Sequence, residues 1–442
     1  MMIVALELMV LAGSNGYAQP TIPREKIPAT APADVREQIL KLYSQDVKER
    51  MAAVYALKEM EEKAAPAIPF LINLLIDLKY FNWKPPSEPK ERSVSISNEA
   101  ADALKKMGKP AVKFLIPALQ DKSFIVRMQA AKILGQIKDP LAAEPLIAAL
   151  RDENINVRHN SVIALGRIAD PRAVKPLIPF LEDNDEYIRE RATEALAEIH
   201  DSLCVEPLIN VLSDSKETVR RFAIEGLGKS RDTRAVEPLL HVLKDKIPYN
   251  RVLTARALGQ IKDKRAVKPL IHLLKDSNEE IRRTAVRALG EIGDPSAISS
   301  MSALLKDREA LIQYAAADAL ALMGAAGIEP LMNAIRDKRS HVRDIAPRVF
   351  KKIGNPAVQP LVVALKDRNS EFRSYAAFLL GEMNDPNVVE PLIEALKDED
   401  KRVTEMAAFS LARLTGQNLG YDQAKWKEWW EKNKSSSRDK PQ

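Results

Sequence analysis

One phrase of about eleven residues returns ten times along the chain, and it constrains the fold more than any other feature. Its clearest copies have the form AVxPLIxxLKD and end on an aspartate. These aspartates lie 31 residues apart, apart from two steps of 30 late in the series. They are Asp121, Asp152, Asp183, Asp214, Asp245, Asp276, Asp307, Asp337, Asp367 and Asp398. A fixed period of this length is typical of stacked structural repeats.

A second phrase, of the form VRxxAxxALGxI, follows each copy, for example IRRTAVRALGEI at 281–292. Counted from its arginine, positions +3, +7 and +10 are apolar, as in Ala285, Leu289 and Ile292. This spacing indicates one buried stripe on a helix. The proline of the first phrase suits the opening turn of another helix, where a missing N–H is not needed. Each unit therefore predicts two helices of about eleven and fourteen residues.

Two such short helices cannot bury both apolar stripes alone, so the units must stack on one another. Two less regular units, at 34–60 and 66–107, precede the ten regular ones and bring the total to about twelve helix pairs. The predicted fold is therefore an all-α solenoid of about twelve two-helix repeats, closed by a C-terminal capping helix.

Composition agrees with this fold and excludes several others. A chain of 442 residues exceeds the ~250–300 residues that usually share one core. Only 16 glycines and 5% aromatic residues leave little for a turn-rich β fold. The single cysteine, Cys204, rules out an intramolecular disulfide and a multi-cysteine zinc site. The net charge of +6 is the remainder of 67 basic and 61 acidic residues, so it does not by itself imply nucleic acid.

The amino terminus carries a ten-residue, mostly apolar run at 3–12, which is too short to span a bilayer but suits a signal peptide. Gly16 and Ala18 favour cleavage after Ala18, although no Lys or Arg precedes the run and Glu7 lies inside it. We expect residues 1–18 to be a signal peptide and the mature chain, without a transmembrane segment, to be periplasmic or secreted. A cytoplasmic protein with an amphipathic first helix is the alternative.

Differences in composition and repeat regularity divide the chain after residue 18 into five expected parts. The expected parts are a Pro-rich linker at 19–33, degenerate repeats at 34–107 with an insertion at 77–95, regular repeats at 108–415, a cap at 416–433 and a polar tail at 434–442. The insertion carries Tyr80, Phe81 and Trp83 ahead of three prolines, which predicts either a peptide-binding flap or a loop packed on the first layers. In the cap, Trp426, Trp429 and Trp430 share one helical face and are expected to shield the last unit.

The Asp…Val-Arg pairs, the Ala-Leu-Gly core and the period of 30–31 residues resemble the short HEAT-like repeats named after phycobilin lyases. The resemblance covers roughly residues 34–415, and the tail at 414–430 is similar to the closing segment of many bacterial HEAT-repeat proteins. It implies a concave face lined by the second helices and, for most members, a protein-binding scaffold. Some members are enzymes, including bilin lyases and DNA glycosylases on related repeats, so the resemblance leaves function open.

The recurring aspartate and arginine have two interpretations. The arginine follows the aspartate by six positions in eight units, and Gln313 and Thr404 replace it in the others. A periodic row of charge could bind anions. We favour a structural role, in which the aspartate accepts N–H bonds at the start of the second helix and the arginine bridges to an aspartate of its own or the adjacent unit.

No motif of catalysis or metal binding is present. The five histidines form no HExxH or HxH motif, and although His241 and His272 occupy the same phase of neighbouring first helices, exposed positions are the favoured interpretation. Cys204 replaces an alanine of the repeat phrase, which marks it as a small packing residue. We therefore predict no catalytic residues, no cofactor and no metal.

The second helices carry a candidate binding surface at positions +2 and +5, which point away from the stripe. Late in the array these positions hold three basic and five apolar residues: Arg256, Arg287 and Arg348, then Ile345, Tyr375, Phe378, Met406 and Phe409. Exposed apolar side chains beside arginine are typical of a binding groove. The alternative is that the C-terminal cap covers this end and makes the rings part of the core.

We accordingly predict a non-enzymatic scaffold that binds a protein or peptide through its concave face. A phycobilin-lyase-like enzyme is the alternative, and nucleic-acid binding is a third possibility that would require longer runs of Lys and Arg. Pro347 lies at position +4 of a second helix, where proline removes a backbone bond and clashes with the preceding turn. We therefore expect the array to bend or loosen between about residues 305 and 355.

Overall fold

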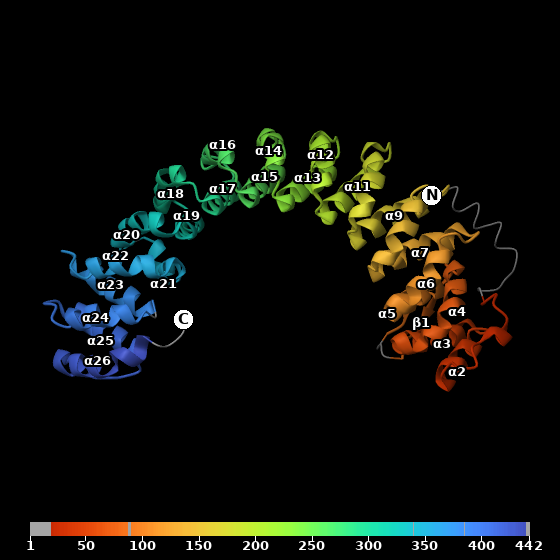
Figure 1. The fold of residues 1–442 in the computed structure, drawn as a ribbon, viewed down its shortest axis with the longest axis horizontal. Helices are drawn as coiled ribbons and strands as arrows, with labels where there is room; N and C mark the ends of the chain where they lie inside the picture. The colour runs from red at the N-terminus through yellow and green to blue at the C-terminus, as the bar shows by residue number, and fades with distance from the viewer. Residues whose placement is uncertain (1–18, 87–89, 339, 384, 439–442) are drawn as a thin grey trace. The chain divides into compact units, whose positions relative to one another are not determined.

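A computed structural model describes residues 19–86, 90–338, 340–383 and 385–438, without the side chains of 435–438. The expected signal peptide at 1–18 lies outside these residues. The chain divides into two compact units, one ending at Gly226 and one beginning at Leu227. In both units short first helices alternate with longer second helices, as Figure 1 shows, and the all-α solenoid is confirmed. Within the described residues, no helix is long and apolar enough to cross a membrane.

Unit 1 contains the two degenerate repeats and the first regular ones. Its helices are α2 (Ala33–Lys41), α3 (Val47–Glu59), α4 (Ile68–Asn73), α5 (Ile96–Met107), α6 (Lys109–Ala118), α7 (Phe124–Ile137), α8 (Ala143–Ala149), α9 (Ile155–Ile168), α10 (Val174–Leu177), α11 (Glu186–Ile199), α12 (Val205–Asn210) and α13 (Glu217–Ser230), the last of which ends beyond Gly226.

Unit 2 contains the remaining repeats and the cap. Its helices are α14 (Val236–Val242), α15 (Pro248–Ile261), α16 (Val267–Leu273), α17 (Glu279–Ile292), α18 (Ile298–Ala303), α19 (Ala310–Leu322), α20 (Ile328–Arg336), α21 (Val342–Ile353), α22 (Val358–Ala364), α23 (Ser370–Glu382), α24 (Val389–Ala395), α25 (Lys401–Thr415) and α26 (Gln423–Arg438). The second helices α15, α17, α19, α21, α23 and α25 pack in succession, each against the next.

The boundaries between repeats have a local cause. Most second helices end on a residue in the left-handed conformation, such as Ala169 (φ 57°) or Gly293 (φ 73°), whereas α19 and α23 do not. The aspartate that follows, for example Asp170 or Asp294, accepts the N–H two residues on and so caps a short 3₁₀ turn. That turn leads into the next first helix. Each of these aspartates is followed by a proline, Pro171 or Pro295, so an Asp-Pro pair closes one repeat and opens the next.

Glycine at position +8 sets how closely consecutive second helices approach. A Cβ added to Gly290 would lie 2.7 Å from both Cα and Cβ of Ala319 on the next second helix. Gly166 meets Ala195 at the same distances. Since real Cβ atoms do not tolerate such contacts, the Ala-Leu-Gly phrase is a packing motif in which glycine admits the neighbouring backbone.

The amino-terminal end contains two short β-strands, the only ones in the described residues. Strands β1 (Tyr80–Trp83) and β2 (Arg92–Ser95) pair antiparallel within the expected insertion, from Tyr80 opposite Ser95 to Trp83 opposite Arg92. Trp83 is buried and its ring lies 5.5 Å from that of Tyr55, whereas Tyr80 is exposed. The insertion is thus anchored to the first layers by one face of a small hairpin.

The segment expected as a Pro-rich linker, 19–33, contacts the first repeats near its start. The Gln19 side chain donates hydrogen bonds to the carbonyls of Tyr43 and Ser44, at 3.2 and 3.0 Å. Thr21 bonds to Asn73 through both its backbone N–H and its hydroxyl. The proline content of this segment indicated an extended chain, but it did not reveal these contacts.

The carboxy-terminal end is closed by α26. Trp426 is fully buried and its Nε1 donates to the carbonyl of Gly420 at 2.8 Å. The helix packs against α24 and the turn before it, where Gln423 donates to the carbonyl of Ile393 and Lys427 pairs with Glu394. It continues to Arg438, past residue 433, where the sequence analysis placed the end of the cap, and into the expected polar tail at 434–442.

Candidate functional site

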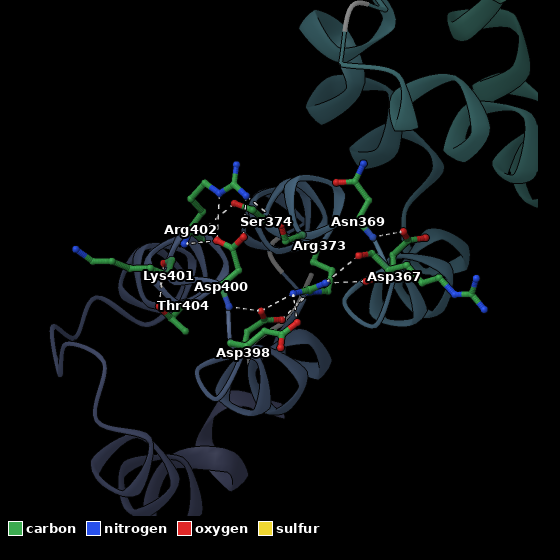
Figure 2. Close-up of polar contacts among 12 residues, drawn as sticks. Asp367, Asn369, Arg373, Ser374, Asp398, Asp400, Lys401, Arg402 and Thr404 are labelled. Atoms are coloured by element: carbon green, nitrogen blue, oxygen red, sulfur yellow. Dashed lines mark hydrogen bonds and ion pairs between the residues drawn. The ribbon is translucent and has the colours of Figure 1, made fainter.

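The first candidate, the row of aspartates and arginines, is a structural element. In Figure 2 the Arg373 guanidinium holds both carboxylate oxygens of Asp398 in the next repeat, at 2.7 Å each, and donates to the carbonyl of Asp367 at 2.9 Å. Asp398 also accepts the N–H of Asp400 at 2.8 Å. The hydrogen bond from Arg373 is the main reason why the pKa of Asp398 is lowered. An external anion would have to displace this carboxylate.

The same arrangement recurs in other repeats. Arg127 holds Asp152, and Arg189 holds Asp214, with Nε–Oδ2 distances of 2.7 and 2.8 Å. Where glutamine replaces the arginine, Gln313 Nε2 still donates to the carbonyl of Asp307 at 2.7 Å. The bond inside one repeat is therefore the commonest part of the arrangement, although Arg343 donates instead to the carbonyl of Ile335. The link to the aspartate of the next repeat is formed by Arg127, Arg189, Arg251 and Arg373. The structural interpretation of these residues is confirmed.

The titratable candidates do not form a reactive cluster. His241 and His272 are both exposed. Cys204 is buried and its pKa is raised to about 11 by that burial, which keeps the thiol protonated and suits a packing residue. In the described part of the chain, no three His, Cys, Asp or Glu side chains are placed to hold a metal ion.

The second candidate is the surface formed by positions +1, +2 and +5 of α15, α17, α19, α21, α23 and α25, which we call the second-helix face. Within unit 2 in Figure 1, α15, α17, α19 and α21 follow one another on one side, with the first helices α14, α16, α18 and α20 on the other. Arg256, Arg287 and Arg348 are exposed, and the Phe409 side chain is 55% exposed. Ile345, Tyr375, Phe378 and Met406 are half-buried.

Side chains at position +2 of the second helices are less exposed to solvent than the sequence predicted. Leu253 on α15 is 3% exposed and Thr284 on α17 is 8% exposed, so both belong to the core. Within α15–α25 this column holds half-exposed large side chains from α21 onward, beginning with Ile345, while earlier in the chain Phe222 on α13 is also half-exposed. The large apolar side chains at positions +2 and +5 of the second-helix face therefore lie on α21, α23 and α25.

Arg348 has a partner within the chain. Its guanidinium forms two contacts of 2.9 Å with the carboxylate of Asp318, which occupies the same +5 position one repeat earlier. The side chains remain 59% and 33% exposed. Side chains at +5 of adjacent second helices can therefore meet across the surface, and Arg348 is an ion-paired neighbour of the apolar residues instead of a free cation.

Tyr375 has a structural role that the sequence did not suggest. Its hydroxyl donates to the backbone carbonyl of Arg343 at 2.6 Å. In an uninterrupted helix that carbonyl would accept the N–H of residue 347, but Pro347 has none. Burial raises the pKa of Tyr375 to about 12, and the Arg343 guanidinium lies 4.6 Å from its ring centre. A tyrosine from α23 thus supplies the hydrogen bond that α21 lacks.

The main contacts of the capping helix are with the first helix of the last repeat. The cap packs against α24, a first helix, and against the turn Pro386–Val388. Phe409 on α25 remains more exposed than buried. Phe378 contacts the ring of Tyr375, with centroids 5.9 Å apart. The alternative in which the cap covers this end of the second-helix face therefore does not describe the position of Phe409.

Two hollows that the sequence did not indicate lie between first helices. One of about 800 Å³ is bordered by α22 and α24, and its lining includes Val362, Pro391 and Glu394. A similar one lies between α6 and α8, with Pro117, Pro145 and Ala148 in its lining. Both are open grooves between consecutive repeats. They arise from repeat stacking, and the sequence phrase carried no signal for them.

Comparison with known families places most of the chain in one of them. A profile described as HEAT repeats matches at 90–154, 143–203, 174–248, 205–268, 236–321 and 358–424, which together exceed half of the chain. A second profile, described as PBS lyase HEAT-like repeat, matches residues 312–337. No curated protein was found to match the sequence.

Several solved structures are similar to this chain. An engineered protein is 21% identical, with 87% of this chain and 99% of that chain covered and a TM-score of 0.42. The complex of CpcE and CpcF of phycocyanin lyase from Nostoc sp. PCC7120 is 25% identical, with coverages of 51% and 93% and a TM-score of 0.33. The Escherichia coli protein YibA is 22% identical, with coverages of 62% and 97% and a TM-score of 0.42.

Proposed function

Because the chain belongs to the HEAT-repeat family, we propose that it is a non-enzymatic scaffold that binds a protein or peptide through the second-helix face of α21, α23 and α25. The observation that carries this proposal is the exposure of Phe409 beside half-buried Met406 and Phe378. A large aromatic side chain gains free energy when a partner removes it from water, and such residues dominate the affinity of protein interfaces.

The pattern of position +5 supports the choice of this end of the array. In most earlier repeats the position holds charged residues such as Lys132, Glu194 and Glu225, with Ile163 as the exception. In α23 and α25 it holds Phe378 and Phe409. Ion pairs border these rings, Arg348 with Asp318 on one side and Arg413 with Glu382 on the other. An apolar centre with a charged rim is the usual anatomy of a protein interface.

A selection from a random peptide library on the full chain tests this proposal. We expect the recovered peptides to lose about tenfold in affinity when Phe409 is changed to Ser, a loss of about 1.4 kcal/mol. Val363→Ser is the matched control, since Val363 is 68% exposed in the same unit but lies on the first helix α22.

The proposal predicts that Phe409→Ser lowers the affinity for the recovered peptides and that Val363→Ser does not. Peptides that bind both variants as well as the wild type would contradict it, and so would a library that yields no binder to the wild type. Melting temperatures of both variants should match the wild type, because each replaced side chain is mostly exposed.

A further inference from the structure

Two arginines on the second-helix face stand out from their neighbours. Arg256 on α15 and Arg287 on α17 are exposed and occupy position +5 of consecutive second helices that pack together. Neither forms an ion pair or hydrogen bond within the part of the chain that the structure describes. Their neighbours differ, since Arg251 pairs with Asp276 and Arg283 with Glu280.

The chain itself shows what such a cation binds at this position. Asp318 and Arg348 are likewise at position +5 of consecutive second helices, and the arginine takes the carboxylate through two contacts of 2.9 Å. A carboxylate presented between Arg256 and Arg287 would meet guanidinium groups on both helices. Paired hydrogen bonds of this kind between guanidinium and carboxylate are stronger than neutral ones and fix the orientation of the ligand.

We propose that the partner of the second-helix face is an acidic protein segment, whose carboxylates bind Arg256 and Arg287 while its apolar side chains contact Phe378 and Phe409. This inference rests on the proposed function and extends it to the chemistry of the partner. The arginines lie toward the start of unit 2 and the rings toward its end, so the segment binds in one direction along the array.

The separation of the two subsites sets the length of the segment. Three packing steps separate α17 from α23, and a fourth reaches α25. At ~9–10 Å for each step, Arg287 and the phenylalanines are roughly 27–40 Å apart, and Arg256 lies one step further. An extended chain covers ~3.3 Å per residue, so about 8–12 residues separate the carboxylates from the apolar side chains.

A nucleic-acid backbone fits this surface less well. Between Arg287 and the rings, the face presents the carboxylate of Asp318, which already neutralises Arg348. Glu382 lies beyond and is bound by Arg413. A strand of phosphates needs a continuous row of cations, whereas this face offers two cations and then apolar side chains.

Synthetic peptides test the inference on the full chain by fluorescence anisotropy. The probe carries two Glu at one end and two Phe at the other, joined by a flexible spacer of 4, 8 or 12 residues. A matched probe carries Gln in place of Glu. We expect the 8- or 12-residue spacer to bind best, and the Gln probe to bind about tenfold more weakly at low salt.

Variants assign the effect to the two arginines. Arg256→Ala with Arg287→Ala should weaken the Glu probe about tenfold and leave the Gln probe unchanged. Arg368→Ala is the control, since Arg368 is exposed in the loop between α22 and α23. The double change of Arg256 and Arg287 to Glu should reverse the preference toward a probe with two Lys.

The outcomes separate this inference from the proposed function. If the Gln probe binds as tightly as the Glu probe and both depend on Phe409, the acidic partner is refuted and the apolar site stands. If neither probe binds, both proposals fail. Binding of a 20-nucleotide single strand that depends on Arg256 and exceeds that of every peptide would also overturn the inference.

Discussion

The hydrogen bond from Tyr375 to the carbonyl of Arg343 makes the most specific prediction about the fold. Tyr375→Phe removes only the hydroxyl, so the packing of the ring is kept. The loss combines a hydrogen bond of about 1 kcal/mol with the cost of an unpaired carbonyl, for a total of about 1–3 kcal/mol. In Pro347→Ala, residue 347 regains an N–H that can bond to the same carbonyl. In that background we expect Tyr375→Phe to cost less than about 1 kcal/mol.

A double-mutant cycle measures this coupling. The wild type, both single variants and the double variant are unfolded in urea, and hydrogen exchange of residues 342–353 follows the local effect. We expect a coupling energy of about 1–2 kcal/mol. Tyr314→Phe is the control, because the Tyr314 hydroxyl bonds instead to the exposed carboxylate of Asp344 at 3.0 Å. Its loss should cost less than about 0.5 kcal/mol.

The reasoning is refuted if Tyr375→Phe costs the same with Pro347 as with Ala at that position. Such a result would mean that the hydroxyl does not replace the bond that proline removes. Equal costs for Tyr375→Phe and Tyr314→Phe would refute it as well.

Three further predictions concern the rest of the chain, together with one about its processing. In chemical denaturation, Arg373→Gln should destabilise the protein by about 2–4 kcal/mol and Arg373→Leu by more, since only Gln keeps the bond inside the repeat. Arg373 lowers the pKa of Asp398, so the stability difference from wild type should be complete above about pH 4. That difference should shrink as the pH falls through the lowered pKa of Asp398. Ala169→Gly should stabilise by about 0.5–1 kcal/mol in the same assay, because residue 169 is left-handed; a loss of stability would contradict this. Amides between 305 and 355 should exchange faster than those of neighbouring repeats, as expected of a proline-interrupted segment, and equal rates would count against a bend there. The intact mass of native protein should begin at Gln19, and a retained Met1 would refute export.

The sequence predicted the repeat, the two-helix unit and the structural role of the Asp–Arg row because each follows from local chemistry repeated at fixed spacing. The function of Tyr375 was not predictable in the same way. The sequence showed that Pro347 removes a backbone hydrogen bond from its helix. The hydroxyl that replaces this bond belongs to the second helix of the next repeat, and its position is fixed only by the packing of the two repeats. Sequence columns could have paired Arg348 with Asp318, since both stand at +5 in consecutive units.

The side of the last repeat that the cap covers was likewise beyond the sequence. Three tryptophans on one face of a helix indicate burial, but they do not say against which neighbour. In the structure the cap packs against α24, Trp426 is fully buried, and Phe409 on α25 is 55% exposed. A cap packed on α24 leaves a binding surface on α25, whereas a cap packed over the rings of α23 and α25 would remove it.

The most direct test of the binding surface is photo-crosslinking in the source cell. A photoreactive phenylalanine analogue is placed at residue 409 in one strain and at residue 363 in another, and the crosslinked peptides are sequenced by mass spectrometry. We predict a discrete adduct at 409 only, on a segment whose Asp or Glu residues lie about 8–12 positions from the crosslinked residue. Equal adducts at both positions, or a segment at 409 without nearby carboxylates, would contradict the account.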